Sequence, residues 1–192
     1  LRNRGRRYKK RSVIYDKRGT IPNRTDISQR PPEVELRERF GDLEIDLIIG
    51  KNHKGAILTI NDRATGFGKL RKLDGKDAQQ LATATIDCLM EWKPFLKTIT
   101  SDNGKEFAAH QLVAKQLNID FFFAKPYASW QRGSNENFNR LVRQYIPKKV
   151  DFDCIPQDYI NFVETQLNNR PRKRFKYESP MFMFNQKVAF ST

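Results

Sequence analysis

The sequence predicts a mixed α/β fold, in which one sheet carries helices packed over its faces. Three observations lead to this fold class. After Gly41, three strand-like runs follow one another, joined by short polar connections. Two helical patterns then alternate with two short apolar runs, and further helical patterns complete the chain. The 192 residues suffice for one domain with extensions, and nothing resembles a linker between two cores.

The N-terminal part is expected to differ from the rest. Residues 1–30 contain eleven Lys or Arg against two Asp, and Pro22, Pro31 and Pro32 favour an extended backbone until about Phe40. We therefore expect a basic extended arm or linker over residues 1–40 and a folded domain over residues 41–192.

A dense basic cluster in this arm cannot form a packed core by itself. Its charge favours neutralisation of DNA phosphates over a solvated arm that contacts nothing. The residues that we assign to this contact are Arg6, Arg7, Lys9, Lys10 and Arg11.

The elements of the domain follow from periodicity. Alternating or apolar runs predict strands at residues 43–49, 56–60 and 66–73, which the short connections join into an antiparallel meander. Helical spacing and buried runs then predict, in order, a helix at 76–92, a strand at 95–100, a helix at 105–117, a strand at 119–124 and a last helix at 157–168.

The helix that begins near Ser134 is the centre of the functional prediction. Phe138 and Val142 lie on its apolar stripe, and Ser134 is expected to be its N-cap. A carboxylate in the first helical turn is stabilised by the helix dipole, so Glu136 taken alone is explained by ordinary capping chemistry.

Composition limits the class of partner. The chain has 36 Lys+Arg against 22 Asp+Glu, a net charge of +14 and a pI near 9.9, which indicates nucleic acid or another anionic surface. No apolar run approaches the roughly 20 residues that span a membrane, and no signal peptide is visible. We therefore expect no membrane partner.

Three acids stand where regular elements could bring them together. Asp46 is in a predicted strand, Asp102 follows another, and Glu136 opens a helix. Converging carboxylates repel one another unless a cation lies between them, and oxygen ligands alone favour Mg²⁺ or Mn²⁺ over zinc. On a basic protein, this set predicts two-metal phosphoryl transfer on nucleic acid. Alternation equally allows Asp42 or Glu44 as the first ligand.

Three segments resemble the catalytic blocks of DDE transposases, and most closely the bacterial branch named after insertion sequence thirty. They are Leu-Glu-Ile-Asp-Leu-Ile-Ile-Gly at 43–50, Ser-Asp-Asn-Gly-Lys-Glu-Phe at 101–107 and Trp-Gln-Arg-Gly-Ser-Asn-Glu-Asn at 130–137. Segments 21–24 and 167–173 are similar to that branch too, so the resemblance covers nearly the whole chain. Leu43 is a departure, because the branch usually has Trp there.

The resemblance implies a ribonuclease H-like core, related to retroviral integrases, that cuts and joins DNA with two Mg²⁺ or Mn²⁺ ions. It selects Asp46, Asp102 and Glu136 as the catalytic and metal-binding residues. Residues near these blocks are assigned to DNA contact, although a solvated surface would explain several of them: Lys105, Trp130, Arg132, Arg140 and Arg143.

The same resemblance implies insertion-sequence ends and target DNA as partners, a homodimer or larger assembly, and a place in the bacterial cytoplasm with the nucleoid. The family carries a helix-turn-helix domain upstream. The chain opens on Leu1 rather than Met, so we expect it to be part of a longer protein. The alternatives are a plain ribonuclease H-like nuclease and a DNA-binding protein that has lost cutting activity.

Overall fold

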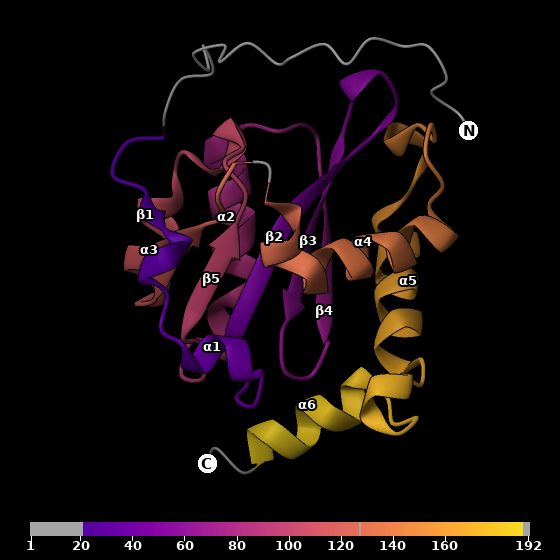
Figure 1. Cartoon of the computed structure of the whole chain (residues 1–192). Coiled ribbons are helices and arrows are strands. Elements are labelled where there is room, and N and C mark those ends of the chain that lie inside the picture. The colour runs from indigo at the N-terminus through magenta and orange to yellow at the C-terminus, as the bar shows by residue number, and fades with distance from the viewer. Residues whose placement is uncertain (1–20, 127, 190–192) are drawn as a thin grey trace, which may run out of the picture.

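The computed structural model of this chain describes residues 21–126 and 128–189. Within them, six strands form one mixed sheet in the order β1-β6-β5-β2-β3-β4 (Figure 1). The strands are β1 (Thr25–Asp26), β2 (Asp42–Ile49), β3 (Ala56–Asp62), β4 (Gly68–Leu73), β5 (Thr98–Ser101) and β6 (Asp120–Phe123). Strands β2, β3 and β4 form the predicted antiparallel meander. On the other side of β2, β5 runs parallel to β2, β6 runs parallel to β5, and β1 runs parallel to β6.

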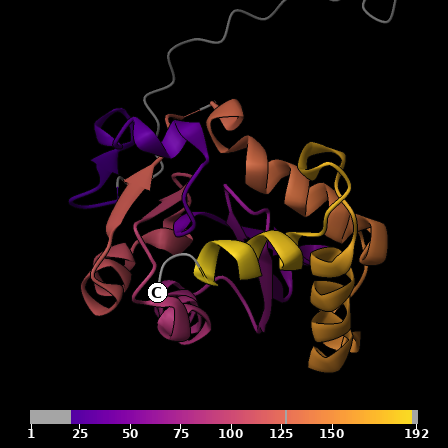
Figure 2. The same ribbon diagram turned by 90° about the horizontal axis from the view of Figure 1, so that it is seen from below.

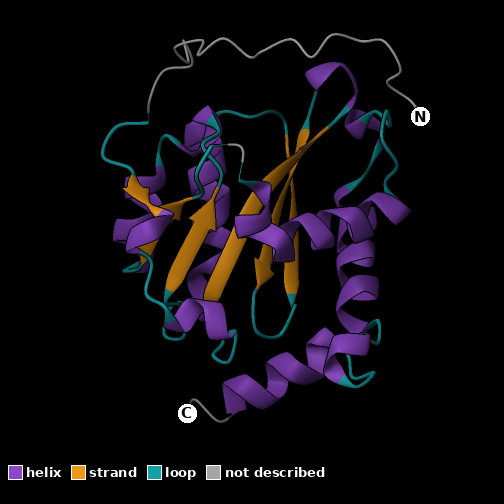
Figure 3. Ribbon diagram, in the orientation of Figure 1, coloured by secondary structure: helices purple, strands orange, loops and turns teal. Residues whose placement is uncertain are grey.

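Helices cover both faces of the sheet, as Figure 3 shows. They are α1 (Glu33–Leu36), α2 (Ala78–Leu89), α3 (His110–Leu117), α4 (Gly133–Tyr145), α5 (Gln157–Asn169) and α6 (Pro180–Ala189). Alternate residues of β2 belong to different cores: Ile45 packs with α2 and α3, and Ile48 packs with α4 and α5. The side chains in step with Ile48, among them Glu44 and Asp46, therefore face the α4 side of the sheet.

Two predicted elements are shorter than expected. The N–H groups of Phe95 and Leu96 bond to the carbonyl of Trp92, which closes a turn, so β5 begins only at Thr98. The helix predicted at 105–117 begins instead as a 3₁₀ turn, Lys105–Phe107, before α3 starts at His110. Both differences concern the ends of elements, where hydrogen bonds to a neighbouring turn outweigh the apolar pattern.

The expected extended arm differs more. From Ile21 onward the chain is part of the domain, because Ile21 and Val34 are buried and β1 adds to the sheet beside β6. The prediction of an extended backbone was also wrong, because Ile27–Gln29 form a 3₁₀ turn and Pro32 has a helical conformation at the start of α1. Residues 1–20, with the basic cluster at 6–11, lie outside the described residues.

Helix α6 was not predicted. Seen from below in Figure 2, it crosses under the sheet. Its Phe184 stacks on Phe67 with ring centroids 4.5 Å apart and also contacts Phe40 and Trp92. Across the described residues, no helix is long and apolar enough to cross a membrane.

Strand β4 lies at the edge of the sheet, and side chains of α5 cover its outer side. The N–H groups of Gly68, Leu70 and Lys72 donate to Asn168 Oδ1 at 2.9 Å, Glu164 Oε2 at 2.6 Å and Gln157 Oε1 at 3.2 Å. These are the alternate N–H groups that point away from β3. The helix therefore takes the place of a further strand, and it satisfies donors that an edge strand would leave open.

Candidate active site

Asp46 lies on β2, facing α4. Its Oδ1 accepts the N–H of Leu47 at 2.8 Å, and its Oδ2 accepts the side-chain amide of Asn139 at 3.1 Å. Burial raises the pKa of the Asp46 carboxyl, Arg132 opposes that rise, and the negative charge of Asp102 adds to it. A carboxylate in this position is stabilised by a neighbouring positive charge.

Asp102 directly follows β5, the parallel neighbour of β2. The register pairs Leu43 with Ile99 and Glu44 with Thr100. Continued by two residues, it brings residues 46 and 102 to the same part of the sheet. The turn after the strand is held by Asp102 itself, whose Oδ1 accepts the N–H of Gly104 at 2.9 Å.

Arg132 lies between these two acids. Its Nη1 is 3.3 Å from Asp46 Oδ2, and its Nη2 is 3.3 Å from Asp102 Oδ2. Nη1 also donates to the carbonyl of Ile45 at 3.3 Å, and the side chain is only 12% exposed. The sequence placed Arg132 on a DNA-facing surface; in this structure its guanidinium instead bridges the two predicted catalytic carboxylates.

Glu136 is not grouped with the other two acids. It is an exposed residue in the first turn of α4 and lines a groove of about 600 Å³ together with Leu47 and Arg140. In the described part of the chain, no three His, Cys, Asp or Glu side chains are arranged to hold a metal ion. Two of the three predicted acids are thus adjacent, and the third stands on the neighbouring groove.

The start of α4 differs from the prediction. The helix begins at Gly133, and the buried Ser134 hydroxyl caps nothing. Instead, the N–H of Asn135 donates to Glu44 Oε2 at 2.8 Å. A carboxylate from β2 therefore does the work of a cap, and it satisfies one of the N–H groups that a helix leaves open at its start. No local pattern could have indicated it, because 91 residues separate the two partners.

α4 can approach the sheet closely because β4 begins with a glycine. A Cβ at Gly68 would lie 2.2 Å from the ring of Phe138, which packs directly on the strand backbone. The predicted apolar stripe is confirmed in its central residues, since Phe138 and Val142 are buried.

The two alternatives for the first ligand are fully bonded inside the protein. Asp42 is 1% exposed and accepts hydrogen bonds from Arg39 Nε and Thr98 Oγ1, each at 2.8 Å. Glu44 is completely buried against Arg63 and Asn135. Asp46 is the acid of β2 that lies beside a second predicted catalytic acid.

The other residues assigned to DNA contact vary in accessibility. Lys105 and Arg140 are exposed, and Trp130 is 75% exposed. Arg143 is half-buried and donates to the carbonyls of Ile49 and Pro147, both at 3.2 Å; burial lowers its pKa. Sequence reasoning missed Lys148, which lines the groove with Arg140 and Glu136. The Lys-Lys pair after the helix was the signal that could have found it.

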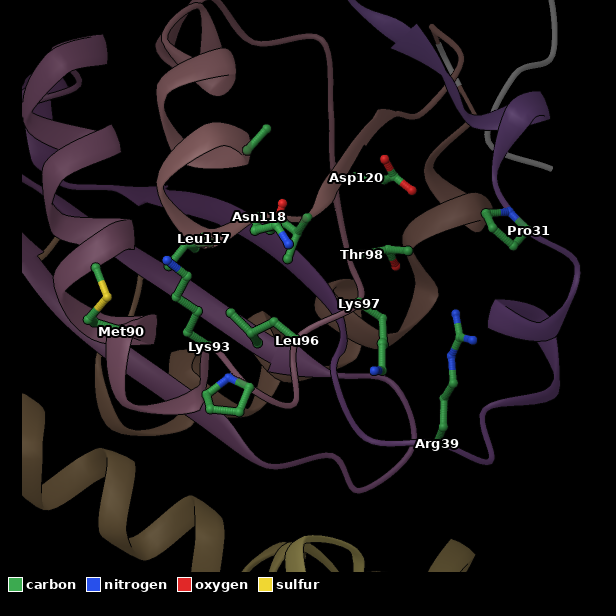
Figure 4. Close-up of a pocket in the computed structure, with 13 residues that line it drawn as sticks. Pro31, Arg39, Met90, Lys93, Leu96, Lys97, Thr98, Leu117, Asn118 and Asp120 are labelled. Atoms are coloured by element: carbon green, nitrogen blue, oxygen red, sulfur yellow. The ribbon is translucent and has the colours of Figure 1, made fainter. Parts of the chain in front are cut away.

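A larger groove of about 990 Å³ lies elsewhere (Figure 4). It is lined by Thr98 and Asp120, the first residues of β5 and β6, and by Arg39, Lys93 and Lys97. Asp102 follows the opposite end of β5, so this groove is not part of the candidate site.

Comparison with known proteins relates the chain to mobile DNA elements. No protein-family model matches it. Over its whole length it is 57% identical to the transposase for insertion sequence element IS4351 from Bacteroides fragilis, and it covers 60% of that protein. Over 96% of its length it is 35% identical to transposase InsI for insertion sequence element IS30C from Escherichia coli strain K12, and it covers 49% of that protein. The chain thus spans about half of the length of these relatives.

Among solved structures, the catalytic core domain of BIV integrase is similar, with a TM-score of 0.62 and 19% identity. The match covers 78% of this chain and 97% of that one. The predicted fold class is therefore confirmed. By sequence the chain is a homologue of insertion-sequence transposases, and its fold is the ribonuclease H-like fold of integrase catalytic cores.

Proposed function

We propose that this chain is the catalytic part of a DDE transposase, which cuts and joins DNA at insertion-sequence ends with Asp46, Asp102 and Glu136. The observation that carries this proposal is the pair of carboxylates from β2 and β5 that share one cation, Arg132. The names and identities of the homologues support the same activity.

The donors suit divalent metal ions. The acids offer oxygen atoms only, and burial makes a nearby positive charge favourable at Asp46. Asp46 and Asp102 would hold Mg²⁺ or Mn²⁺, and Glu136 would complete the set from α4. Two such ions supply positive charge at the attacking and leaving oxygens of phosphoryl transfer.

The side chains of the protein would bind and orient the DNA. Arg140 and Lys148 line the groove beside Glu136, where they can contact phosphates. Trp130, two residues before Arg132 in the sequence, exposes its ring and offers a surface on which an unpaired base can stack. Arg132, once relieved of the two carboxylates, provides a further cation for the DNA backbone.

The remaining elements of the proposal follow from the relatives. The partners are insertion-sequence ends and target DNA, and two or more copies act together on paired ends. The protein works beside the chromosome in the bacterial cytoplasm.

Cleavage of labelled linear and branched DNA duplexes in Mg²⁺ or Mn²⁺ tests this function. Asp46→Asn, Asp102→Asn and Glu136→Gln each keep the side-chain shape but remove a charge, so cleavage and joining should fall by orders of magnitude while DNA binding persists. Glu106→Gln is the matched control, because Glu106 lies in the turn after Asp102 but outside the proposed set.

Two results would refute the proposal. If the three variants cut as well as the parent, these acids are structural. If the folded parent binds DNA but cuts none in either metal, the chain is a DNA-binding protein. Cleavage without joining would favour the nuclease alternative.

A further inference from the structure

A network of hydrogen-bonded polar side chains links the three elements that carry the candidate acids. The residues at the edges of this network are close to those acids in sequence. Glu44 precedes Asp46 by two residues on the same face of β2, and Thr100, which is on β5, precedes Asp102 by two residues. On α4, Asn135 directly precedes Glu136.

Glu44 is the member that joins β2 to α4. Its Oε2 accepts the N–H of Asn135 at 2.8 Å, and its Oε1 accepts Arg63 Nη1 at 2.6 Å. Arg132, at the N-cap position of α4, makes no side-chain capping bond to the helix, and the Ser134 hydroxyl has no partner. Glu44 is therefore the side chain that caps the first turn of α4.

The remaining hydrogen bonds of this network lead from Arg63 back to β5. Arg63 Nη2 pairs with Glu35 Oε2 at 2.8 Å, and Glu35 pairs through its other oxygen with Arg30. Arg30 Nη1 donates to Thr100 Oγ1 at 2.9 Å. The side chains of Arg30, Arg63 and Glu44 are at most 3% exposed. Buried charges persist only when paired, so each member depends on its neighbours.

Apolar packing alone does not fix where α4 sits along the sheet. Phe138 and Val142 hold the helix on the sheet, but such contacts are non-directional and tolerate sliding. The bond from Glu44 is directional, and Glu44 lies only about 7 Å along β2 from Asp46. Together with Arg132, which donates to the Ile45 carbonyl at 3.3 Å, and Asn139, which donates to Asp46 Oδ2 at 3.1 Å, this bond therefore fixes the start of α4 relative to Asp46.

We propose that Glu44 is a positioning residue of the active site. By capping α4 from β2, it sets where Glu136 stands relative to Asp46 and Asp102, while Arg63 balances its charge. This inference rests on the proposed metal-dependent function.

Two double variants separate the cap from the ion pair. Glu44→Gln with Arg63→Met removes both charges but keeps an oxygen that can accept the N–H of Asn135. Glu44→Leu with Arg63→Met removes both charges and the acceptor. Replacing a buried ion pair by groups of similar size is often tolerated. In both variants Glu35 loses its bond to Arg63, so this loss does not distinguish them.

The measurement is Mn²⁺ affinity by calorimetry on DNA-free protein, at a temperature where circular dichroism shows each variant folded. The Gln variant should bind like the parent. The Leu variant should bind Mn²⁺ about fivefold more weakly. Without the cap, part of the binding free energy is used to order the first turn of α4, and this costs about as much as one capping hydrogen bond contributes. If the Leu variant does not fold, Glu44→Met with Arg63→Met gives the same test, because Met is close to Glu in length and also lacks the acceptor.

The matched control is Asp77→Ala. Asp77 caps α2 by accepting the N–H of Gln80 at 2.9 Å, and α2 carries none of the three acids. This variant should lose stability and keep its Mn²⁺ affinity. If the Leu variant, or the Met variant in its place, binds Mn²⁺ as the parent does, Glu44 is only a core residue and the inference is overturned. A parent whose Mn²⁺ binding is absent, or unaffected by Asp102→Asn, would instead refute the proposed function on which it rests.

Discussion

Arg132→Gln gives the sharpest test of the charge balance between Asp46 and Asp102. The guanidinium lies 3.3 Å from each carboxylate and also donates to the Ile45 carbonyl at 3.3 Å. The Arg132 side chain is 12% exposed, and the Asp102 side chain is 40% exposed. Partial exposure reduces the value of the pair, so its loss should cost about 1–2 kcal/mol of metal-free stability. For a domain of this size, that cost lowers Tm by several degrees.

The same substitution should strengthen metal binding. In the proposed function the ions take over the charge that Arg132 supplies, so Arg132 competes with them. Relief of about 1.4 kcal/mol would raise Mn²⁺ affinity about tenfold. Thermal unfolding with and without Mn²⁺, combined with calorimetry, measures both effects: the deficit in Tm should shrink as Mn²⁺ is added.

Arg143→Gln is the control for this experiment. Arg143 is a half-buried arginine of the same helix, but it donates to the backbone carbonyls of Ile49 and Pro147. It should lose stability without a gain in Mn²⁺ affinity. If Arg132→Gln binds Mn²⁺ no more tightly than Arg143→Gln does, Arg132 does not compete for the metal site and the reasoning fails.

Three further predictions follow from other features. Deleting residues 1–20 removes nine Lys or Arg but leaves β1 intact, so the slope of log DNA affinity against log salt should flatten by about 0.9 for each phosphate that these residues neutralise; an unchanged slope would mean that these charges do not meet DNA. Trp130→Ala should leave Tm unchanged, because the ring is 75% exposed, yet weaken binding of DNA with unpaired ends by about 1–3 kcal/mol; equal weakening on fully paired DNA would argue against stacking. Burial raises the pKa of Asp62 to about 6, above its value in the unfolded chain, so the folded protein holds the proton more tightly. The stabilisation from protonated Asp62 is therefore present near pH 4 and is lost as the pH rises through 6. Denaturant titrations at pH 4.5 and pH 7 should show this loss, at most about 3 kcal/mol, in the parent but not in Asp62→Asn.

Local patterns predicted the parts of the fold that local forces determine. The meander of β2, β3 and β4 pairs neighbouring segments, and the apolar stripe of α4 is a property of that helix alone. Strand β1, only two residues long, exists because β6 lies beside it, almost 100 residues away in sequence. No propensity of such a short segment could have indicated it.

In the candidate site too, local sequence predicted some features, and others depend on contacts between distant segments. Alternation left Asp42, Glu44 and Asp46 open, and the resemblance selected Asp46 and Asp102, whose side chains both lie beside Arg132. The position of Arg132 between them depends on how the loop before α4 returns to the sheet. The exchange of the expected Ser134 cap for Glu44 also depends on a contact between distant elements. Burial decides such exchanges, because a carboxylate enclosed in the core must find donors wherever the fold supplies them.

The cover over the β4 edge limits how copies of this protein can associate. The outward N–H groups of Gly68, Leu70 and Lys72 are already bound to α5. A second molecule could extend the sheet at β4 only by breaking all three bonds and displacing the helix. The proposed assembly on paired DNA ends must therefore avoid continuous sheets across that edge and be built from helix surfaces, loops or the DNA itself. Such contacts can form and separate without unfolding either partner, which suits the proposed cutting and joining of DNA, after which the product must be released.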